Sequence, residues 1–203
     1  MEHLEVLDTS LRDGSQAEGI AFTVEDKLNI LKALDELGIP LVECGNPVSN
    51  PKDREFFAQA ADLSLPHARA AAFGSTRRKD RTAETDENLA ALLQSGAGVL
   101  SIVGKCSSFQ VTEVLQATRE ENLAMIAETL CYLTAKGKAV YFDCEHFFDG
   151  FKDDRQYAMK ALHAAQEAGA ACLVLCDTNG GTLPQEAYEI TKYVCENTRV
   201  RVG

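Results

Sequence analysis

Short apolar segments alternate with longer amphipathic segments along the whole of this 203-residue chain. The apolar segments are too short for helices, are often β-branched and lie between turn residues, so we predict that they are strands. They are Leu4–Leu7, Leu41–Cys44, Ala68–Phe73, Val99–Val103, Ala139–Phe142, Cys172–Cys176 and Val200–Val202. Because a crossover of helical length follows each strand, the strands are expected to form a parallel sheet with helices outside it.

The segments between these strands carry the apolar period and the end signals of helices. Val24–Leu37 follows Thr23, and Asp26 stands three residues later as in a capping box. Asn50 and Pro51 supply a cap and a first-turn proline for the next helix. The predicted helices are Val24–Leu37, Pro51–Ala61, Ala83–Ser95, Val111–Ala135, Asp154–Ala168 and Pro184–Asn197, of which the fourth is long enough to be broken.

Two architectures fit this order of elements, an open doubly wound sheet and a (β/α)8 barrel. The first strand-to-helix turn, Asp8-Thr-Ser-Leu-Arg-Asp-Gly14, lacks the GxGxxG pattern of a dinucleotide fold. Polar residues instead follow strand after strand, as barrel active sites require. They are Arg12, Asp13, Glu43, Asn46, Lys105, Asp143, Glu145, Asp177 and Thr178. We therefore predict an α/β fold, a (β/α)8 TIM barrel truncated after about strand seven, with residues 1–203 as one incomplete catalytic domain.

Composition excludes several classes of function. Thirty-one acidic residues against twenty basic ones give a net charge of −11, which argues against nucleic acid and anionic membrane as partners. No run of about 20 apolar residues is present. The seven cysteines form no CxxC pair, and four of them lie inside or at the edge of apolar segments. We interpret these as small buried apolar residues in a reducing compartment, and we expect a cytoplasmic protein.

The first loop holds the strongest candidate for chemistry. Arg12 and Asp13 place a permanent cation beside a hard oxygen ligand. Such a carboxylate suits Mg²⁺ or Mn²⁺, and it also suits Zn²⁺ when imidazole partners are present. The arginine is placed to stabilise a developing oxyanion. The alternative interpretation of the dipeptide is a salt bridge that caps the barrel.

Three further segments carry polar groups. Asp143-Cys-Glu-His146 offers two carboxylates and an imidazole for acid–base work, or acids that only cap the next helix. Asp177-Thr-Asn-Gly-Gly181 offers a hydroxyl and an amide for a small carboxylate, or only a turn that needs glycine. The basic segment Arg77-Arg-Lys-Asp-Arg81 favours a solvated loop over a phosphate site.

Several blocks of sequence resemble one known family. Asp8-Thr-Ser-Leu-Arg-Asp-Gly-Ser-Gln16 resembles the DTTLRDGxQ signature of the DRE-type TIM-barrel metallolyases, which are the isopropylmalate, homocitrate and citramalate synthases and their lyase relatives. The blocks that resemble the citramalate synthase branch are Ala17–Lys27, Ser49–Asp53, Phe73–Arg78, Glu120–Ile126, Glu145–Gly150 and Leu175–Pro184. The resemblance extends over essentially the whole chain.

The resemblance implies a Claisen-type condensation of acetyl-CoA with pyruvate, which gives citramalate and CoA for isoleucine biosynthesis. It implies a divalent metal (Mg, Mn or Zn) with Asp13 as one ligand, and acetyl-CoA as co-substrate. By position, Arg12 resembles the cation that polarises the reacting carbonyl, and Gln16 resembles the amide beside it. Glu145 resembles the carboxylate on the proton-transfer path, and Thr178 resembles the hydroxyl that binds the keto acid's carboxylate.

The chain also departs from this branch. Gly45-Asn-Pro-Val48 stands where the branch has Gly-Trp-Pro-Gly, and Gly104-Lys-Cys-Ser-Ser-Phe-Gln110 replaces Gly-Lys-Ser-Trp-Asp-Phe-His. The resemblance leads us to expect an acyltransferase that is a homodimer at full length. It also leads us to expect His-x-His metal ligands and a C-terminal regulatory domain beyond residue 203, without which the chain alone is inactive. The alternatives are 2-isopropylmalate synthase, homocitrate synthase, a lyase, and an inactive barrel fragment that serves as a binding module.

Overall fold

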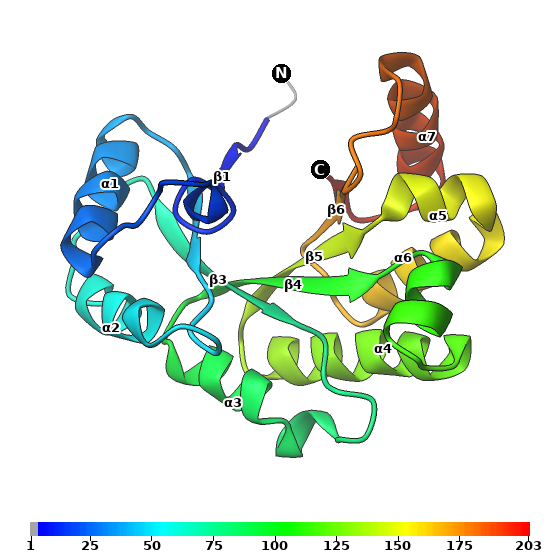
Figure 1. The fold of residues 1–203 in the computed structure, drawn as a ribbon, viewed down its shortest axis with the longest axis horizontal. Coiled ribbons are helices and arrows are strands. Elements are labelled where there is room, and N and C mark those ends of the chain that lie inside the picture. The colour runs from blue at the N-terminus through cyan, green and yellow to red at the C-terminus, as the bar shows by residue number, and fades with distance from the viewer. Residues whose placement is uncertain (1–3) are drawn as a thin grey trace. The chain divides into compact units, whose positions relative to one another are not determined.

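The computed structural model describes residues 4–203 as alternating strands and helices (Figure 1). Two compact units divide the chain, one made of residues 4–74 and 90–101 and the other of residues 75–89 and 102–203. Within residues 4–203, no helix combines the length and the apolar character that a membrane span needs. The strands are β1 Leu7–Asp8, β2 Leu41–Gly45, β3 Arg69–Ser75, β4 Val99–Lys105, β5 Ala139–Glu145, β6 Cys172–Leu175 and β7 Arg201–Val202.

The order of the strands decides between the two predicted architectures. The sheet has the order β1-β2-β3-β4-β5-β6-β7. The pairs β1–β2 and β2–β3 in the first unit, and β5–β6 and β6–β7 in the second, are all parallel. A doubly wound sheet reverses its strand order at a switch point, whereas a barrel adds each strand next to the previous one. The order is therefore that of a (β/α)8 barrel through its seventh strand, and the predicted fold class is confirmed.

The helices with clear end signals begin and end close to the predicted residues. Thr23 and Asp26 form the predicted capping box at the start of α1, and the side chain of Asn50 caps α2. The observed helices are α1 Val24–Glu36, α2 Pro51–Ala60, α3 Glu87–Gln94, α4 Arg119–Ala135, α5 Phe147–Asp153, α6 Arg155–Glu167 and α7 Pro184–Asn197.

Three elements begin several residues after their predicted first residue. β1 begins at Leu7 rather than Leu4, because the side chain of Leu4 is 86% exposed and contributes nothing to the core. The segment predicted as one helix from Ala83 begins as a separate 3-10 turn and becomes helical only at Glu87. The long fourth helix is broken, as the sequence allowed: a π-helical turn ends at Val114, and α4 starts afresh behind its cap.

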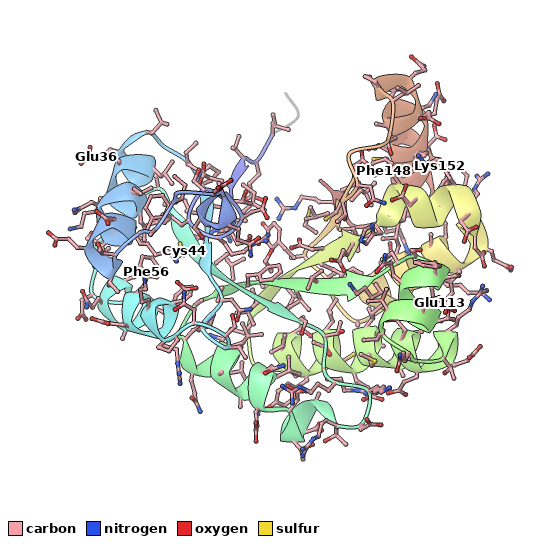
Figure 2. All side chains as sticks on the ribbon, viewed as in Figure 1. Glu36, Cys44, Phe56, Glu113, Phe148 and Lys152 are labelled. Atoms are coloured by element: carbon pink, nitrogen blue, oxygen red, sulfur yellow. The ribbon has the colours of Figure 1, made fainter. Side chains whose placement is uncertain are left out.

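Helix α5 was missed by the sequence reasoning. It is only seven residues long, has Gly150 in its middle and starts after His146 in the left-handed conformation, at φ 53°. A Cβ on Gly150 would lie 2.6 Å from the carbonyl oxygen of Cys106, so this glycine permits a close approach of two backbones. The rings of Phe147 and Phe148 are buried and anchor the helix. Figure 2 labels Phe148 and Lys152 on this helix.

Four of the seven thiols are buried: Cys44, Cys106, Cys144 and Cys172. Burial raises the pKa of the thiols of Cys44 and Cys144, which keeps both protonated at neutral pH. Cys44 of β2 and Phe56 of α2, both labelled in Figure 2, are fully buried in the first unit. The interpretation of these cysteines as packing residues holds for the buried four, whereas Cys131 and Cys195 are exposed.

Asp154 caps α6 and is expected to make stability depend on acid pH. The pKa of Asp154 is lowered, chiefly by the hydrogen bond from the Tyr157 N–H at 3.0 Å and also by Arg119, whose Nη1 donates at 2.8 Å. A group with a lowered folded-state pKa stabilises the fold above its unfolded pKa of about 3.9, and that stabilisation is lost as the pH falls through the folded value. Asp154→Asn keeps a cap but removes the charge.

We therefore expect the melting temperature of wild type to exceed that of Asp154→Asn at pH 5 to 7, and the difference to shrink below about pH 4. Thermal unfolding across that range measures it. Asp153→Asn, an exposed neighbour, is the matched control and should show no such convergence. A difference between wild type and Asp154→Asn that stays constant from pH 3 to pH 7 contradicts the linkage.

Candidate active site

The loop after β1 is shaped by its own polar groups and anchored by one apolar residue. Asp8 accepts hydrogen bonds from the N–H and the hydroxyl of Ser10, at 3.0 and 3.2 Å. The carbonyl of Thr9 accepts from the N–H groups of Arg12 and Gly14, each at 3.1 Å. Leu11 is fully buried beneath the loop. The loop is thus a tight turn, and the hydrogen bond to Thr9 fixes the backbone of Arg12 within it.

Arg12 is held on three sides. Its Nε donates to the carboxylate of Glu43, its Nη1 donates to Asp13 Oδ1 at 3.1 Å, and its guanidinium carbon lies 4.0 Å from the centre of the Phe73 ring. The side chain is 19% exposed, so the cation is largely shielded but reaches solvent. A guanidinium fixed by a carboxylate and a ring is pre-organised to stabilise charge on a substrate oxygen.

The sequence placed Glu43 among the strand-end polar residues but indicated no specific role for it. It lies in β2, where all five residues are buried, and its side chain is 1% exposed. One oxygen pairs with Arg12, and the other, Oε1, has no hydrogen-bond partner among the described residues. The available signal was a carboxylate inside an otherwise apolar strand, because an acid is buried in such a place only with a partner.

Asp13 and Gln16 lie at the surface beside Arg12. The side chain of Asp13 is 64% exposed, and the N–H of Gln16 donates to the Asp13 carbonyl at 3.0 Å within a 3-10 turn, Gly14–Gln16. The exposed Asp13 carboxylate fits the chemistry of one hard oxygen ligand. Residues 4–203 contain no cluster of three or more histidine, cysteine, aspartate or glutamate side chains arranged to hold a metal. Asp13 is thus a candidate for a single ligand.

In the second unit, Glu145 ends β5 and pairs with Lys105 at the end of β4. The side chains of Lys105 and Glu145 are 24% and 26% exposed. The N–H of Cys106 donates to the Glu145 carbonyl at 3.3 Å, which fixes the backbone of both residues. The sequence placed Lys105 among the strand-end polar residues but did not predict this ion pair.

Thr178 follows β6, and the turn around it is held by its neighbours. The Thr178 hydroxyl oxygen accepts from the His146 N–H at 2.9 Å, so its own proton is left to donate. Asp177 accepts from the N–H and hydroxyl of Thr182, and Gly180 has φ 63°, as the turn interpretation requires. Asn179 donates to Asp149 at 2.6 Å. The Thr178 hydroxyl is exposed, and its proton can therefore be donated to a ligand.

The side chains of Asp143, Glu145 and His146 lie in different environments. Asp143 is buried within β5, whereas Glu145 lies at the strand end in contact with Lys105. Nδ1 of His146 lies 3.7 Å from Asp149 Oδ2, so the imidazole faces the start of α5. Asp143, Glu145 and His146 therefore do not act as one acid–base cluster, and of the two carboxylates Glu145 is the one that keeps access to solvent.

The solvated-loop interpretation is wrong for Arg77, the first residue of the basic segment. Its side chain is 4% exposed and donates to Glu121 at 2.8 Å and to Glu128 at 2.6 Å. Burial lowers the pKa of Arg77, but these two carboxylates raise it by more, so the guanidinium stays charged. Arg78, Lys79 and Arg81 are exposed as predicted.

The sequential parallel strands, with polar groups at their carboxyl ends, define a protein of the TIM-barrel class. Residues 3–202 match the family model described as HMGL-like, and the chain belongs to the HMGL-like family. Within that family it is 50% identical over 200 residues to an (R)-citramalate synthase of Sulfolobus acidocaldarius, covering 98% of this chain and 38% of the relative. The chain thus spans well under half the length of that relative.

A second relative and a solved structure are more distant. A 2-isopropylmalate synthase of Streptococcus gallolyticus is 31% identical over 199 residues, which cover 98% of this chain and 37% of that protein. The crystal structure of a Bacillus subtilis HMG-CoA lyase is similar with a TM-score of 0.75 at 18% identity, over 95% of this chain and 64% of that chain. At that identity the structural likeness supports the fold alone.

Proposed function

We propose that this chain is part of a citramalate synthase, which condenses acetyl-CoA with pyruvate to give citramalate and CoA. The observation that carries the proposal is the 50% identity to an (R)-citramalate synthase across nearly the whole chain, against 31% to a 2-isopropylmalate synthase. The fixed Arg12 cation beside an exposed carboxylate supports it, because an aldol-like addition needs a stabilised oxyanion.

In the proposed reaction, the methyl group of acetyl-CoA loses a proton to a base, and its carbon bonds to C2 of pyruvate. The electron pair of the C2 carbonyl moves to oxygen, which is protonated to a hydroxyl. Water then hydrolyses the thioester and releases CoA. Glu145 is the base or proton relay, because it is the carboxylate of its strand that reaches solvent.

Arg12 and Thr178 are the keto-acid-binding residues in this proposal, and Gln16 lies in the same loop as Arg12. Arg12 donates to the keto oxygen as it gains charge, since Glu43 and Asp13 fix the remaining edges of the guanidinium. The Thr178 hydroxyl donates to the substrate carboxylate, because its oxygen already accepts from His146. Asp13 supplies one ligand to a divalent metal, which when bound acts as a Lewis acid toward the keto acid.

The keto-acid preference is the direct test. We expect the full-length protein to use pyruvate at least about tenfold better in kcat/KM than 2-oxoisovalerate, which corresponds to about 1.4 kcal/mol of discrimination. Release of CoA, measured with a thiol reagent for each keto acid, gives both constants. 2-Oxoglutarate serves as the third substrate, because it tests the homocitrate alternative.

A preference for 2-oxoisovalerate or 2-oxoglutarate would assign the protein to isopropylmalate or homocitrate synthesis instead. Absence of CoA release with all three, from folded full-length protein supplied with Mg²⁺, Mn²⁺ or Zn²⁺, would leave the binding-module alternative. Asn46 and Val48 are the positions to exchange first if the preference is weak, because they stand where the branch carries tryptophan and glycine.

The proposal includes a cytoplasmic location and a homodimer. Seven free thiols support a reducing compartment. The net charge of −11 agrees with small-molecule substrates and argues against nucleic acid and membrane as partners. Sedimentation of the full-length protein tests the dimer directly.

A further inference from the structure

Lys105 has no part in the mechanism above, yet it is the side chain that contacts Glu145. Its ammonium donates to Glu145 Oε2, and both side chains are about three-quarters buried at the carboxyl ends of neighbouring strands. Stability alone is a weak reason for a partly buried ion pair, because the cost of desolvating both charges offsets their attraction. The position of the ammonium determines which carboxylate oxygen is left to accept a proton.

A buried amide holds the backbone from which the Lys105 side chain departs. Asn122 of α4 is fully buried, and its Nδ2 donates both to the Lys105 carbonyl at 2.9 Å and to the Tyr157 hydroxyl at 2.8 Å. Burial raises the pKa of Tyr157 to about 12, so the hydroxyl stays neutral and its proton remains available for the Arg119 carbonyl at 3.4 Å. The strand end at Lys105 is therefore braced by α4 and α6.

The pair opens onto a cavity of about 220 Å³ in the second unit. The cavity walls combine the ion pair with hydroxyl, cationic and apolar groups, namely Ser75, Thr76, Arg78, Leu115 and Met125. A carboxylate at the edge of such a cavity acts as a base only if one oxygen is directed to the substrate, because proton transfer needs a hydrogen-bond distance and a fixed direction. A cation bound to the other oxygen supplies that direction.

We propose that Lys105 is the positioning residue for Glu145 in the proton-transfer step: its ammonium holds Oε2 so that Oε1 takes the proton from the acetyl methyl group. The C–H electron pair passes into the enolate, and the proton stays on Glu145 until it is transferred onward. This inference rests on the proposed condensation. Lys105 touches no reacting atom in it and acts only through Glu145.

The test is a double-mutant cycle in the full-length protein, with CoA release as the assay. We expect Lys105→Met to lower kcat by about 10²-fold with KM for the keto acid little changed. Lys105→Arg, which keeps a cation, should recover most of that loss. In the Glu145→Gln background, Lys105→Met should lower kcat no further, because the residue through which it acts is already disabled.

Lys160→Met is the matched control, because Lys160 is an exposed lysine on α6, and it should match wild type. Thermal unfolding checks each variant, and Lys105→Gln replaces Lys105→Met in the cycle if the methionine variant does not fold. Near-wild-type kcat without the cation, equal losses in the arginine and methionine variants, or losses that multiply with Glu145→Gln would each overturn the inference. If wild type releases no CoA with any keto acid, the proposed function fails instead, and the exchange of acetyl methyl protons with D2O then shows whether Lys105 and Glu145 still transfer protons.

Discussion

Replacing Arg12 by alanine is expected to lower kcat of the full-length protein by about 10²- to 10³-fold, the loss typical of removing one oxyanion donor. The guanidinium is fixed by Glu43, Asp13 and the Phe73 ring, so the substitution removes a donor whose direction is set before the substrate binds. Arg12→Lys should keep part of the binding of the keto acid but lower kcat and kcat/KM together, because an ammonium lacks the planar fork. Steady-state CoA release with saturating acetyl-CoA measures both.

The Arg12→Ala variant is also expected to have a lower free energy of unfolding, and this effect must be separated from the loss of catalysis. Removing Arg12 leaves the buried Glu43 carboxylate without its partner, at a cost of about 3–5 kcal/mol. Arg12→Ala combined with Glu43→Gln removes that uncompensated charge and should recover much of the stability. It should recover no activity. Arg54→Ala, an exposed arginine in the same unit, is the matched control.

Activity close to wild type in Arg12→Ala, or recovery of activity together with stability in the double variant, would contradict the catalytic role. Either result would return Arg12 to the interpretation as a salt bridge that caps the barrel. The two interpretations separate here because the salt bridge acts on the free energy of unfolding, whereas an oxyanion donor acts on the transition state.

The sequence predicts the features whose causes are local. α7 has the predicted bounds Pro184–Asn197, and Thr23 with Asp26 begins α1 as predicted, because caps and first-turn prolines act within a few residues. The first strand-to-helix turn, which lacks the GxGxxG pattern, argued against a dinucleotide fold before the strand order was known. Only the order of the strands, however, separates a barrel from an open sheet, and that order is a property of long-range pairing.

Two ion pairs at the site were not predicted, because their partners are distant in sequence. Arg12 and Glu43 are 31 residues apart, and Lys105 and Glu145 are 40 apart. The sequence placed all four at strand ends without indicating which would meet. Helix α5 was missed because a seven-residue segment with a central glycine has little helical signal of its own and depends on packing against Cys106.

The ion pair between Lys27 of α1 and Asp53 of α2 is expected to be the most sensitive point for stability in the first unit. Lys27 and Asp53 are 5% and 6% exposed, and the ammonium donates to Asp53 Oδ1. Asp53 Oδ2 accepts from the Asn46 N–H at 2.8 Å, so the pair also holds the loop after β2. A Cβ on Gly45 would lie 2.5 Å from the Asp53 carboxylate, which shows how closely the backbone surrounds this group.

We expect Asp53→Ala to lower the free energy of unfolding by about 3–5 kcal/mol, because it leaves the Lys27 ammonium buried without a partner and frees the Asn46 N–H. Lys27→Met should cost a similar amount, since it leaves the carboxylate unpaired. Lys32→Met on the same helix and Asp62→Ala just beyond α2 are matched controls at exposed positions, where substitutions usually change stability by at most about 0.5 kcal/mol. Urea unfolding followed by circular dichroism measures all four.

The double variant Lys27→Met with Asp53→Leu, compared with Lys27→Met alone and Asp53→Leu alone, tests whether the two charges depend on each other. Replacing both charges by apolar groups of similar volume removes the desolvation penalty of both ions, so the double variant should regain most of the stability lost by either single variant. It cannot restore the acceptor for the Asn46 N–H, so the loop after β2 should stay loosened and KM for the keto acid should rise although the protein is stable. If the losses of the two single variants simply add in the double variant, Lys27 and Asp53 act independently. If they form a pair, the second substitution removes an interaction that the first has already removed, and the losses do not add.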